Sequence, residues 1–264
     1  KDEVTGAGNL VYTHHPLGVL YSTTRANWNH NVYYYALHDN TIIGKFEGHQ
    51  SDVCSISMHP ENDTFISADR NAILHLWDLR ACNPQNIRDL KVLRYRLQHQ
   101  FQLPSVSFSP DGAQFAVVEQ NAVRIFDNRK SSKESRLYRF KFQNRKPRPQ
   151  QKQMENPDQI GVQWTPDAKS IVISGKHEAQ YIDTNEPNQE QVNIYSNDRQ
   201  DNRKHFYREQ TMDFKPCISP DGKYLLWGND ESRKRISIHE VDGENYSQPV
   251  SMWDNHPQGI TSIH

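Results

Sequence analysis

The sequence predicts an all-β fold built from repeated sheets, and three features of the chain support this prediction. A turn in which proline precedes a strand recurs at Pro16, Pro60, Pro110, Pro166 and Pro220, with 44 to 56 residues between successive copies. Short apolar runs of strand length follow each proline. The later of these runs ends 16 to 19 residues after the proline in every copy, whereas the remaining length varies. Constant inner spacing with variable outer loops indicates strands that are constrained by neighbouring sheets.

The copy at residues 47–100 is the most regular, and it identifies the type of repeat. It begins with Gly48-His49, and its third strand ends with Trp77-Asp78. Its apolar runs lie at Val53–Met58, Thr64–Ser67 and Ile73–Trp77. This combination is typical of one blade of a WD-repeat β-propeller. The predicted fold class is therefore an all-β WD-repeat β-propeller, in which the other elements are less regular copies of this blade.

The blades follow one another in chain order within a single predicted domain, residues 1–264. We expect them near residues 10–46, 47–100, 101–142, 159–195 and 211–250. Residues 253–264 begin a further unit, whose first strand is predicted at 259–263. Because each blade of a propeller needs its neighbours, we expect this chain to be a fragment of a seven-bladed propeller. An open or partner-closed propeller is the alternative.

Outer strands and insertions account for the variable lengths between repeats. Residues 136–142 alternate aromatic with basic side chains, which predicts an outer strand whose charged face discourages pairing with other chains. Residues 143–158 and 185–209 are polar and lack periodicity, apart from a possible strand at Val192–Tyr195. We expect both segments to be mobile excursions from the sheets.

Composition and charge exclude several classes of function. The net charge is -1, so the chain as a whole is not drawn to nucleic acid or membranes. No apolar stretch approaches the roughly 18 residues of a membrane-spanning helix, and no signal peptide opens the sequence. The three cysteines form no Cys-x-x-Cys pair. We therefore expect a soluble protein of a reducing, intracellular compartment.

Motifs that carry catalytic chemistry are missing from the sequence. It contains no His-Glu-x-x-His, nucleophile elbow, P-loop or EF-hand calcium loop. The 13 histidines are scattered along the chain, and those in turns favour structural roles over metal binding. We therefore expect a protein that is not an enzyme and that uses no cofactor and no metal.

A buried polar network is expected inside the regular blade. In a WD repeat, the histidine after glycine bonds to a hydroxyl of the second strand, and an aspartate of the following turn joins them with the tryptophan indole. Such a network stabilises a sheet when every member is satisfied. The residues predicted to form it here are His49, Ser67, Asn71, Trp77 and Asp78. Because Asn71 stands where the turn aspartate is usual, we expect a weaker network without charge-assisted bonds.

Basic residues in the turns between second and third strands predict a binding rim. These turns share one rim of a propeller, so their side chains would converge there. The residues are Arg25, Trp28, Arg70, Lys176, His177, Arg233 and Lys234. Arginine and lysine beside an aromatic residue suit an acidic or phosphorylated peptide. The alternative is ordinary surface charge.

A second basic set lies between residues 129 and 152, where ten Lys and Arg residues accompany one acidic residue, Glu134. Its central members are Arg136, Arg139, Lys141, Arg145, Lys146 and Arg148. This basic insertion could contact the phosphates of RNA, of DNA or of a phosphorylated tail. The alternative is a solvated edge strand followed by a disordered loop.

Several stretches resemble a known family, that of WD repeat-containing protein 82 and its fungal Swd-type counterparts. They are Tyr12–His14, Leu20–Thr23, Tyr35–Asn40, Phe46–His49, Asn62–Ser67 and Leu76–Arg80. The resemblance is best over residues 10–80 and thinner through Phe108–Gly112 and Ser219–Gly222. Asn71 and the two insertions depart from the family pattern.

The resemblance implies a non-enzymatic adaptor located in the nucleus. Members of this family are seven-bladed propellers in the COMPASS complex that methylates lysine four of histone H3. They also occur in complexes that couple protein phosphatase 1 and RNA 3′-end processing to transcription termination, and they are associated with the phosphorylated tail of RNA polymerase II. The partners implied are a SET-domain methyltransferase, a phosphatase scaffold or 3′-end processing factors.

Two alternatives remain open at the level of the sequence. Trp77-Asp78-Leu79-Arg80 fits the Trp-Asp-x-Arg pattern of substrate receptors for cullin-RING ubiquitin ligases. The basic insertion fits an RNA-binding propeller of an RNA-processing complex. Each alternative assigns the function to a different surface of the same fold.

Overall fold

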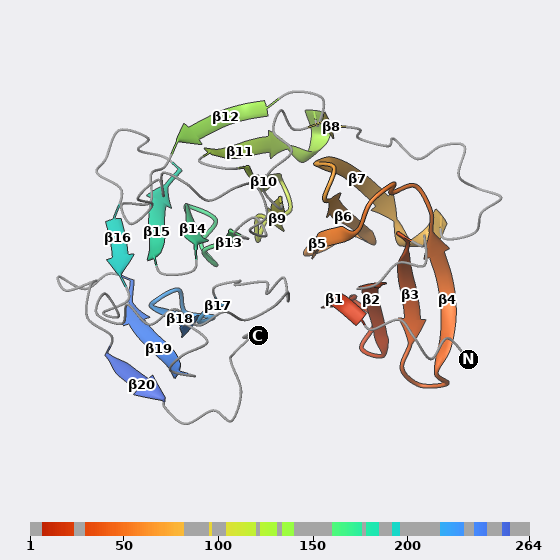
Figure 1. Ribbon diagram of the computed structural model, residues 1–264, viewed down its shortest axis with the longest axis horizontal. Coiled ribbons are helices and arrows are strands. Elements are labelled where there is room, and N and C mark those ends of the chain that lie inside the picture. The colour runs from red at the N-terminus through yellow and green to blue at the C-terminus, as the bar shows by residue number, and fades with distance from the viewer. Residues whose placement is uncertain are drawn as a thin grey trace, which may run out of the picture. The chain divides into compact units, whose positions relative to one another are not determined.

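The computed structural model of the chain (Figure 1) describes residues 7–23, 30–81, 95–96, 104–119, 122–130, 134–139, 160–175, 178–184, 192–195, 217–229, 235–241 and 250–253. The chain divides into two compact units, residues 1–137 and 138–264. Within the described residues, the strands form five four-stranded sheets. Neighbouring strands in each sheet are consecutive in the sequence, so every sheet is a simple meander.

Three of these sheets begin in the first unit. The first sheet contains β1 (Ala7–Tyr12), β2 (Gly18–Thr23), β3 (Val32–Ala36) and β4 (Thr41–Phe46). The second contains β5 (Val53–Met58), β6 (Thr64–Asp69), β7 (Ile73–Asp78) and β8 (Tyr95–Arg96). The third contains β9 (Ser105–Phe108), β10 (Gln114–Glu119), β11 (Ala122–Asp127) and β12 (Glu134–Arg139). Short 3-10 turns, η1 (Leu79–Ala81) and η3 (Asn128–Lys130), follow β7 and β11.

The second unit contains the other two sheets. The fourth sheet contains β13 (Gly161–Trp164), β14 (Ser170–Ser174), β15 (Glu178–Asp183) and β16 (Val192–Tyr195). The fifth contains β17 (Cys217–Ile218), β18 (Tyr224–Asn229), β19 (Arg235–Glu240) and β20 (Ser251–Trp253). The prediction of an all-β fold of repeated sheets is confirmed.

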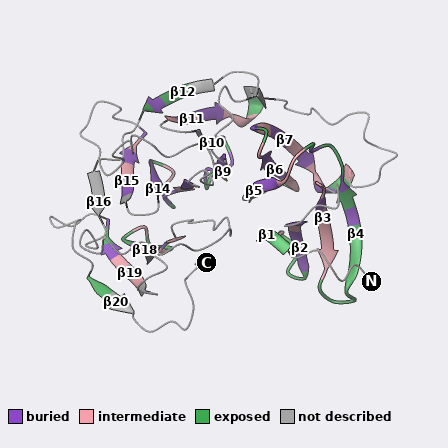
Figure 2. Ribbon diagram, in the orientation of Figure 1, coloured by how far each residue is buried: buried purple, intermediate pink, exposed green. Residues whose placement is uncertain are grey.

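In the first and third sheets, where the burial of both strands is described, the second strand is more buried than the outermost strand. Figure 2 shows β2, β6 and β14 as largely buried, whereas β4 is largely exposed. Strands such as β14 are continuous apolar runs because both of their faces are covered, as expected for sheets that stack face to face. The sequence pattern therefore follows the position of each strand within its sheet.

Aromatic side chains join the first sheet to the second. Leu20 and Phe46 of the first sheet pack with Phe65 and Trp77 of the second, and all four are buried. The Phe46 and Phe65 rings meet edge to face with their centroids 4.9 Å apart. Each fully buried side chain of this size contributes about 1.5–3 kcal/mol to folding. The two sheets are therefore held together mainly by apolar burial.

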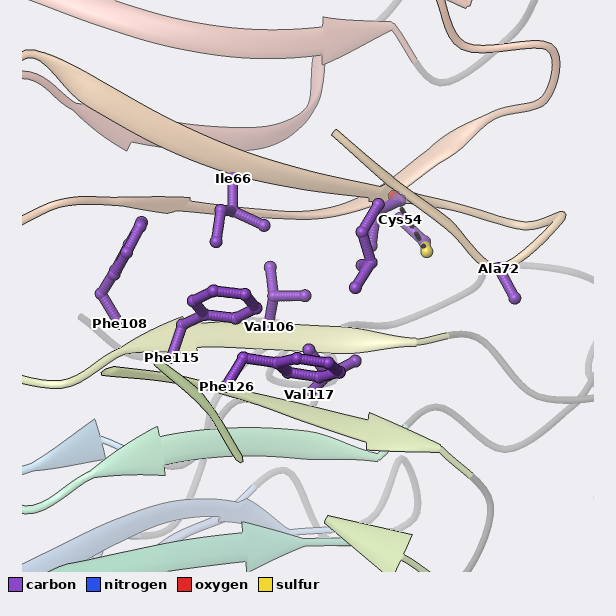
Figure 3. Close-up of a cluster of buried hydrophobic side chains, with 10 residues drawn as sticks. Cys54, Ile66, Ala72, Val106, Phe108, Phe115, Val117 and Phe126 are labelled. Atoms are coloured by element: carbon purple, nitrogen blue, oxygen red, sulfur yellow. Dashed lines mark hydrogen bonds between the residues drawn. The ribbon is translucent and has the colours of Figure 1, made fainter. Parts of the chain in front are cut away.

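The second and third sheets share another apolar cluster, which Figure 3 shows in close-up. Cys54 and Ile66 of the second sheet face Val106 and Phe115 of the third. Hydroxyl groups on β5 also accept hydrogen bonds from β9, the innermost strand of the third sheet. Ser55 Oγ accepts a hydrogen bond from the backbone N–H of Val106 at 3.1 Å, and Ser57 Oγ accepts one from the N–H of Phe108 at 3.0 Å. In the second unit, Val172 and Ala179 pack with residues of the fifth sheet.

Three turns between first and second strands share one design, at residues 109–112, 165–168 and 219–222. Each has Ser or Thr, then Pro-Asp, and the hydroxyl of the first residue bonds to the aspartate carboxylate. The fourth position has a positive φ, which is 65° at Gly112, 58° at Ala168 and 75° at Gly222. Three of the five recurring prolines, Pro110, Pro166 and Pro220, therefore mark one kind of turn.

The structure corrects one boundary of the predicted repeats. Ser251–Trp253 pairs with β19, so Trp253 lies in the fifth sheet and does not begin a new unit. The predicted strand at 192–195 coincides with β16. Of the predicted outer strand 136–142, residues up to 139 lie in β12. The strand predicted at 259–263, the segment 143–158, and the segment 185–209 apart from β16 lie outside the described residues.

Candidate functional site

A buried polar network occupies the interior of the second sheet. Its residues come from three places, because His49 precedes β5, Ser67 and Asp69 lie on β6, and Trp77 lies on β7. His49 Nε2 lies 2.6 Å from Ser67 Oγ, and Trp77 Nε1 lies 2.7 Å from the same oxygen. His49 Nδ1 lies 3.0 Å from Asp69 Oδ2. The structure thus brings together three of the predicted residues, His49, Ser67 and Trp77.

The partners fix the direction of each hydrogen bond in this network. Asp69 can only accept, so His49 Nδ1 carries the proton and donates it to the carboxylate. His49 Nε2 then accepts from the Ser67 hydroxyl, whose oxygen in turn accepts from the Trp77 indole. The other Asp69 oxygen accepts from the backbone N–H of Ile73 at 2.9 Å. Every polar atom in this chain of bonds has a partner.

The carboxylate of the network comes from Asp69. The prediction that Asn71 takes part in the network is wrong. Asn71 lies exposed in the turn between β6 and β7, whereas Asp69 is fully buried at the end of β6. Side chains two apart on a strand point to the same face, so Asp69 is placed on the face of Ser67. That alternation was the sequence signal for Asp69. Because the acceptor is a carboxylate, the network does contain the charge-assisted bonds that Asn71 could not supply.

Asp78 was also predicted to join this network, and the structure places it elsewhere. Its Oδ1 accepts a hydrogen bond from the backbone N–H of Arg80 at 2.9 Å. It therefore closes the short turn η1 that follows β7. The Trp77-Asp78 dipeptide serves two separate structures, with the indole inside the sheet and the carboxylate in the turn after it.

Ser67, His49 and Asp69 are bonded in the same order as the catalytic triad of serine hydrolases. A triad acts only where its serine can reach a substrate. Here Ser67 and Asp69 have no exposed surface, His49 is 8% exposed, and Trp77 already donates to the serine oxygen. This arrangement therefore holds strands in place and cannot attack a substrate.

Of the residues predicted to form the binding rim, the structure describes Arg70. This residue lies in the turn between β6 and β7. Its Nε lies 3.6 Å from Asp52 Oδ2, and the other oxygen of Asp52 lies 3.1 Å from His30 Nδ1. All three side chains are partly exposed. Arg70 is thus already paired with a carboxylate of its own chain. Arg25, Trp28, Lys176, His177, Arg233 and Lys234 lie outside the described residues.

Arg80 lies at the opposite end of β7 from Arg70 and is the more exposed of the two. Its side chain is 73% exposed, and its Nε lies 3.5 Å from Asp78 Oδ1 and 3.7 Å from Asp63 Oδ2. Exposed pairs at such distances contribute little to stability. The arginine of the Trp-Asp-x-Arg pattern therefore reaches solvent.

The basic insertion is described only at its start. Arg136 and Arg139 lie on β12 with exposed side chains, on either side of Leu137 and the buried Tyr138. Lys141, Arg145, Lys146 and Arg148 lie outside the described residues. Within the part of the chain that is described, no three His, Cys, Asp or Glu side chains gather as a metal-ligand set. A search of the same residues found no helix long and apolar enough to cross a membrane.

Comparison with known proteins supports this description of the fold. Residues 40–78 match the family model of the WD domain, G-beta repeat. This match spans β4 to β7 and includes the whole buried network. The chain therefore contains a WD repeat, and its succession of four-stranded sheets is that of a WD-repeat β-propeller.

Several relatives at modest identity carry names of the WD repeat-containing protein 82 and Swd2 type. The chain is 29% identical over 170 residues to WD repeat-containing protein 82 of Drosophila melanogaster, covering 64% of this chain and 47% of that protein. It is 24% identical over 226 residues to Set1 complex component swd2 of Schizosaccharomyces pombe, covering 83% and 55%. It is 26% identical over 255 residues to "Protein ANTHESIS POMOTING FACTOR 1" of Arabidopsis thaliana, covering 95% and 66%. The chain thus spans about half to two thirds of these relatives, and they support its resemblance to the WD repeat-containing protein 82 and Swd2 type.

Proposed function

We propose that this chain is part of a non-catalytic scaffold subunit of a nuclear chromatin complex of the Set1 type, which methylates lysine four of histone H3. The observation that carries this proposal is the set of relatives named WD repeat-containing protein 82 and Set1 complex component swd2. The protein would hold other subunits in place without performing chemistry itself. Links to a phosphatase scaffold, to 3′-end processing factors and to the phosphorylated tail of RNA polymerase II belong to the same proposal.

The geometry of the second sheet supports a scaffold. Its polar network is buried and fully bonded, and apolar clusters join it to the sheets on both sides. Loops at the ends of such sheets are then presented at fixed positions, which is how rigid scaffolds position binding residues. Partner binding would use those loops, including the turn that carries Arg70.

Asp52 sets the condition under which Arg70 could bind an acidic partner. The carboxylate already bonds to His30 and lies near Arg70, so a phosphorylated peptide would have to replace Asp52 at the guanidinium. A phosphate offers more negative charge and more acceptor oxygens than a carboxylate. The proposal therefore favours a phosphorylated peptide over one that carries isolated Asp or Glu residues.

Affinity purification of the tagged full-length protein from nuclei tests the main proposal. We expect a SET-domain methyltransferase or a phosphatase scaffold among the recovered proteins, and recovery of neither would contradict the proposal. Arg70→Ala tests whether the predicted rim takes part, and it should lower recovery of the partner. Arg80→Ala is the matched control, because it removes an exposed arginine from the other end of the same strand.

A second candidate function is that of a substrate receptor for a cullin-RING ubiquitin ligase. The exposure of Arg80 favours it, because the arginine of the Trp-Asp-x-Arg pattern would have to reach an adaptor. Co-purification of the cullin adaptor, lost in Arg80→Ala and retained in Arg70→Ala, would support this function. Absence of the adaptor from the purified wild-type complex would end it.

A further inference from the structure

His59 lies buried at the junction between the second and third sheets. It directly follows β5, and its side chain is 3% exposed against Phe108, with the two ring centroids 5.1 Å apart. Its Nδ1 accepts hydrogen bonds from the backbone N–H groups of Glu61 at 3.0 Å and Asn62 at 2.9 Å. Since Nδ1 accepts two bonds, the ring proton is on Nε2.

The Nε2 side of the same ring reaches the third sheet. It donates to the carbonyl oxygen of Gly112 at 3.2 Å, in the turn between β9 and β10. Gly112 fits closely against the ring, because an added Cβ would lie 2.3 Å from His59 Cε1. The backbone carbonyl of His59 in turn accepts from His14 Nε2 at 2.8 Å. One residue thus connects turns from three consecutive sheets.

Protonation would reverse the role of Nδ1. A doubly protonated ring has no acceptor, so the N–H groups of Glu61 and Asn62 would face another donor. The turn after β5 would then have to move away from the ring, whereas Nε2 keeps its proton and its hydrogen bond to Gly112. We propose that His59 is an acid-sensitive latch on the turn after β5, which holds the N–H groups of Glu61 and Asn62 when neutral and releases them when protonated.

The surroundings of His59 set the direction of its pKa. Burial lowers the pKa below the ordinary value of 6.5, and the neighbouring His14 lowers it further. The hydrogen bond to Gly112 and the carboxylates of Glu61 and Asp111 act in the opposite direction without overcoming burial. These groups come from the turns of all three sheets that surround the ring.

The sign of the pH effect follows from this lowered pKa. Above pH 6.5 the histidine is neutral in both folded and unfolded chains, so it adds no pH dependence. Below pH 6.5 the unfolded chain takes up a proton that the folded chain resists. The free energy of unfolding therefore decreases as the pH is lowered. The loss ends once the pH is below the folded-state pKa. The latch is therefore secure at neutral pH and weakens on mild acidification.

His15 provides a matched control, because it also precedes a proline and its Nδ1 also accepts a backbone N–H, from Leu17 at 3.4 Å. It differs in being exposed. Nuclear magnetic resonance of the wild-type protein, with labelled histidine, should give a pKa for His59 below the ordinary value of 6.5. If His59 titrates at or above 6.5, the latch is ruled out.

A variant tests whether the titration reaches the structure. Asn at position 59 places an amide oxygen near the position of Nδ1 but cannot titrate, so His59→Asn should keep the two turn bonds at every pH. Hydrogen exchange in a peptide covering 59–64, corrected for intrinsic rates, is compared at about pH 7.5 and about pH 5.5, with a peptide covering 109–114 as the reference. We expect acidification to accelerate exchange in the 59–64 peptide of the wild type and of His15→Asn, by up to about tenfold for each unit of pKa depression. Equal acceleration in His59→Asn would overturn the proposal.

Discussion

Ser67 serves two partners with one oxygen, so its loss should affect more than one bond. In Ser67→Ala, Trp77 Nε1 and His49 Nε2 lose their shared partner inside the second sheet. A buried polar group without a partner costs about 1–3 kcal/mol. We therefore expect the free energy of unfolding to fall by about 2–4 kcal/mol in a urea titration.

Thr41→Ala is the control for this loss. It also removes a bonded hydroxyl, which lies 3.0 Å from Asp39 Oδ1, but at an exposed position. Exposed substitutions of this kind change stability by about 0.5 kcal/mol or less. If both variants lost the same stability, the buried network would not be the source of the effect.

Asp69 and Asn71 allow a direct test of which residue completes the network. Asp69→Ala removes the acceptor for His49 Nδ1 and for the N–H of Ile73, and we expect a loss of about 3–5 kcal/mol. Asn71→Ala changes an exposed turn residue and should cost about 0.5 kcal/mol or less. Thermal unfolding of the two variants ranks them, and the reverse order would restore Asn71 to the network.

Two patterns in the sequence, spacing and strand alternation, assign different residues, Asn71 and Asp69, to the network. Spacing from Trp77 pointed to Asn71, because turn positions are usually counted back from the tryptophan. Alternation along β6 favours Asp69, because Ser67 and Asp69 share a face, but the predicted strand ended at Ser67. Burial decides between them, and burial depends on the neighbouring strands, which a count along one strand does not include.

Among the turns between first and second strands, three equivalent positions differ in what surrounds them. Gly222→Ala would place a Cβ 3.7 Å from Pro166, an ordinary contact, so its cost is the left-handed backbone alone, about 1–2 kcal/mol. Gly112→Ala adds a clash with the His59 ring and should cost more. Ala168→Gly relieves the same backbone strain and should stabilise the protein by up to about 1 kcal/mol.

Denaturant midpoints of the three variants provide the measurement. The expected order of stability is Ala168→Gly above wild type, Gly222→Ala below it, and Gly112→Ala lowest. Equal losses at Gly112 and Gly222 would mean that the His59 ring moves aside at little cost. A loss of stability in Ala168→Gly would mean that the alanine side chain contributes more than its backbone strain removes.

The positions of the strands along the chain were predicted well from the sequence. Proline turns and apolar runs located β5, β6 and β7, and β16 coincided with its predicted limits, because each strand alternates or buries its own residues. Trp253 was assigned to a new unit, whose first strand was predicted at 259–263. Its actual place depends on pairing with β19, and pairing is a long-range contact that no local pattern reports.

Across the first unit, three sheets depend on one another through side chains. Ser55→Ala would remove the acceptor of the Val106 N–H, which joins β5 to β9. Because stacked repeats are stabilised by their neighbours, we expect loss of hydrogen-exchange protection in β9 as well as in β5. Protection in the fourth sheet should not change. Loss confined to β5 would show that the sheets open independently.

The binding surface of the whole molecule was the least predictable feature. A rim was inferred from the positions of Arg and Lys in the turns, and Arg70 shows what that inference lacked. Its guanidinium lies near Asp52, a residue 18 positions earlier in the chain, so composition alone overstated its availability. A charged residue on a rim is available to a ligand only to the extent that residues of its own chain do not already pair with it.

The contact between His59 and Gly112 restricts the order in which this sequence can change over evolution. A Cβ at position 112 collides with the imidazole ring, whereas a shorter side chain at position 59 would leave room for it. A lineage that shortens position 59 first can later replace the glycine, but a lineage that replaces the glycine first passes through an unstable intermediate. Two sites 53 residues apart thus form a one-way path, and the glycine is kept both by its positive φ and by a side chain in another sheet.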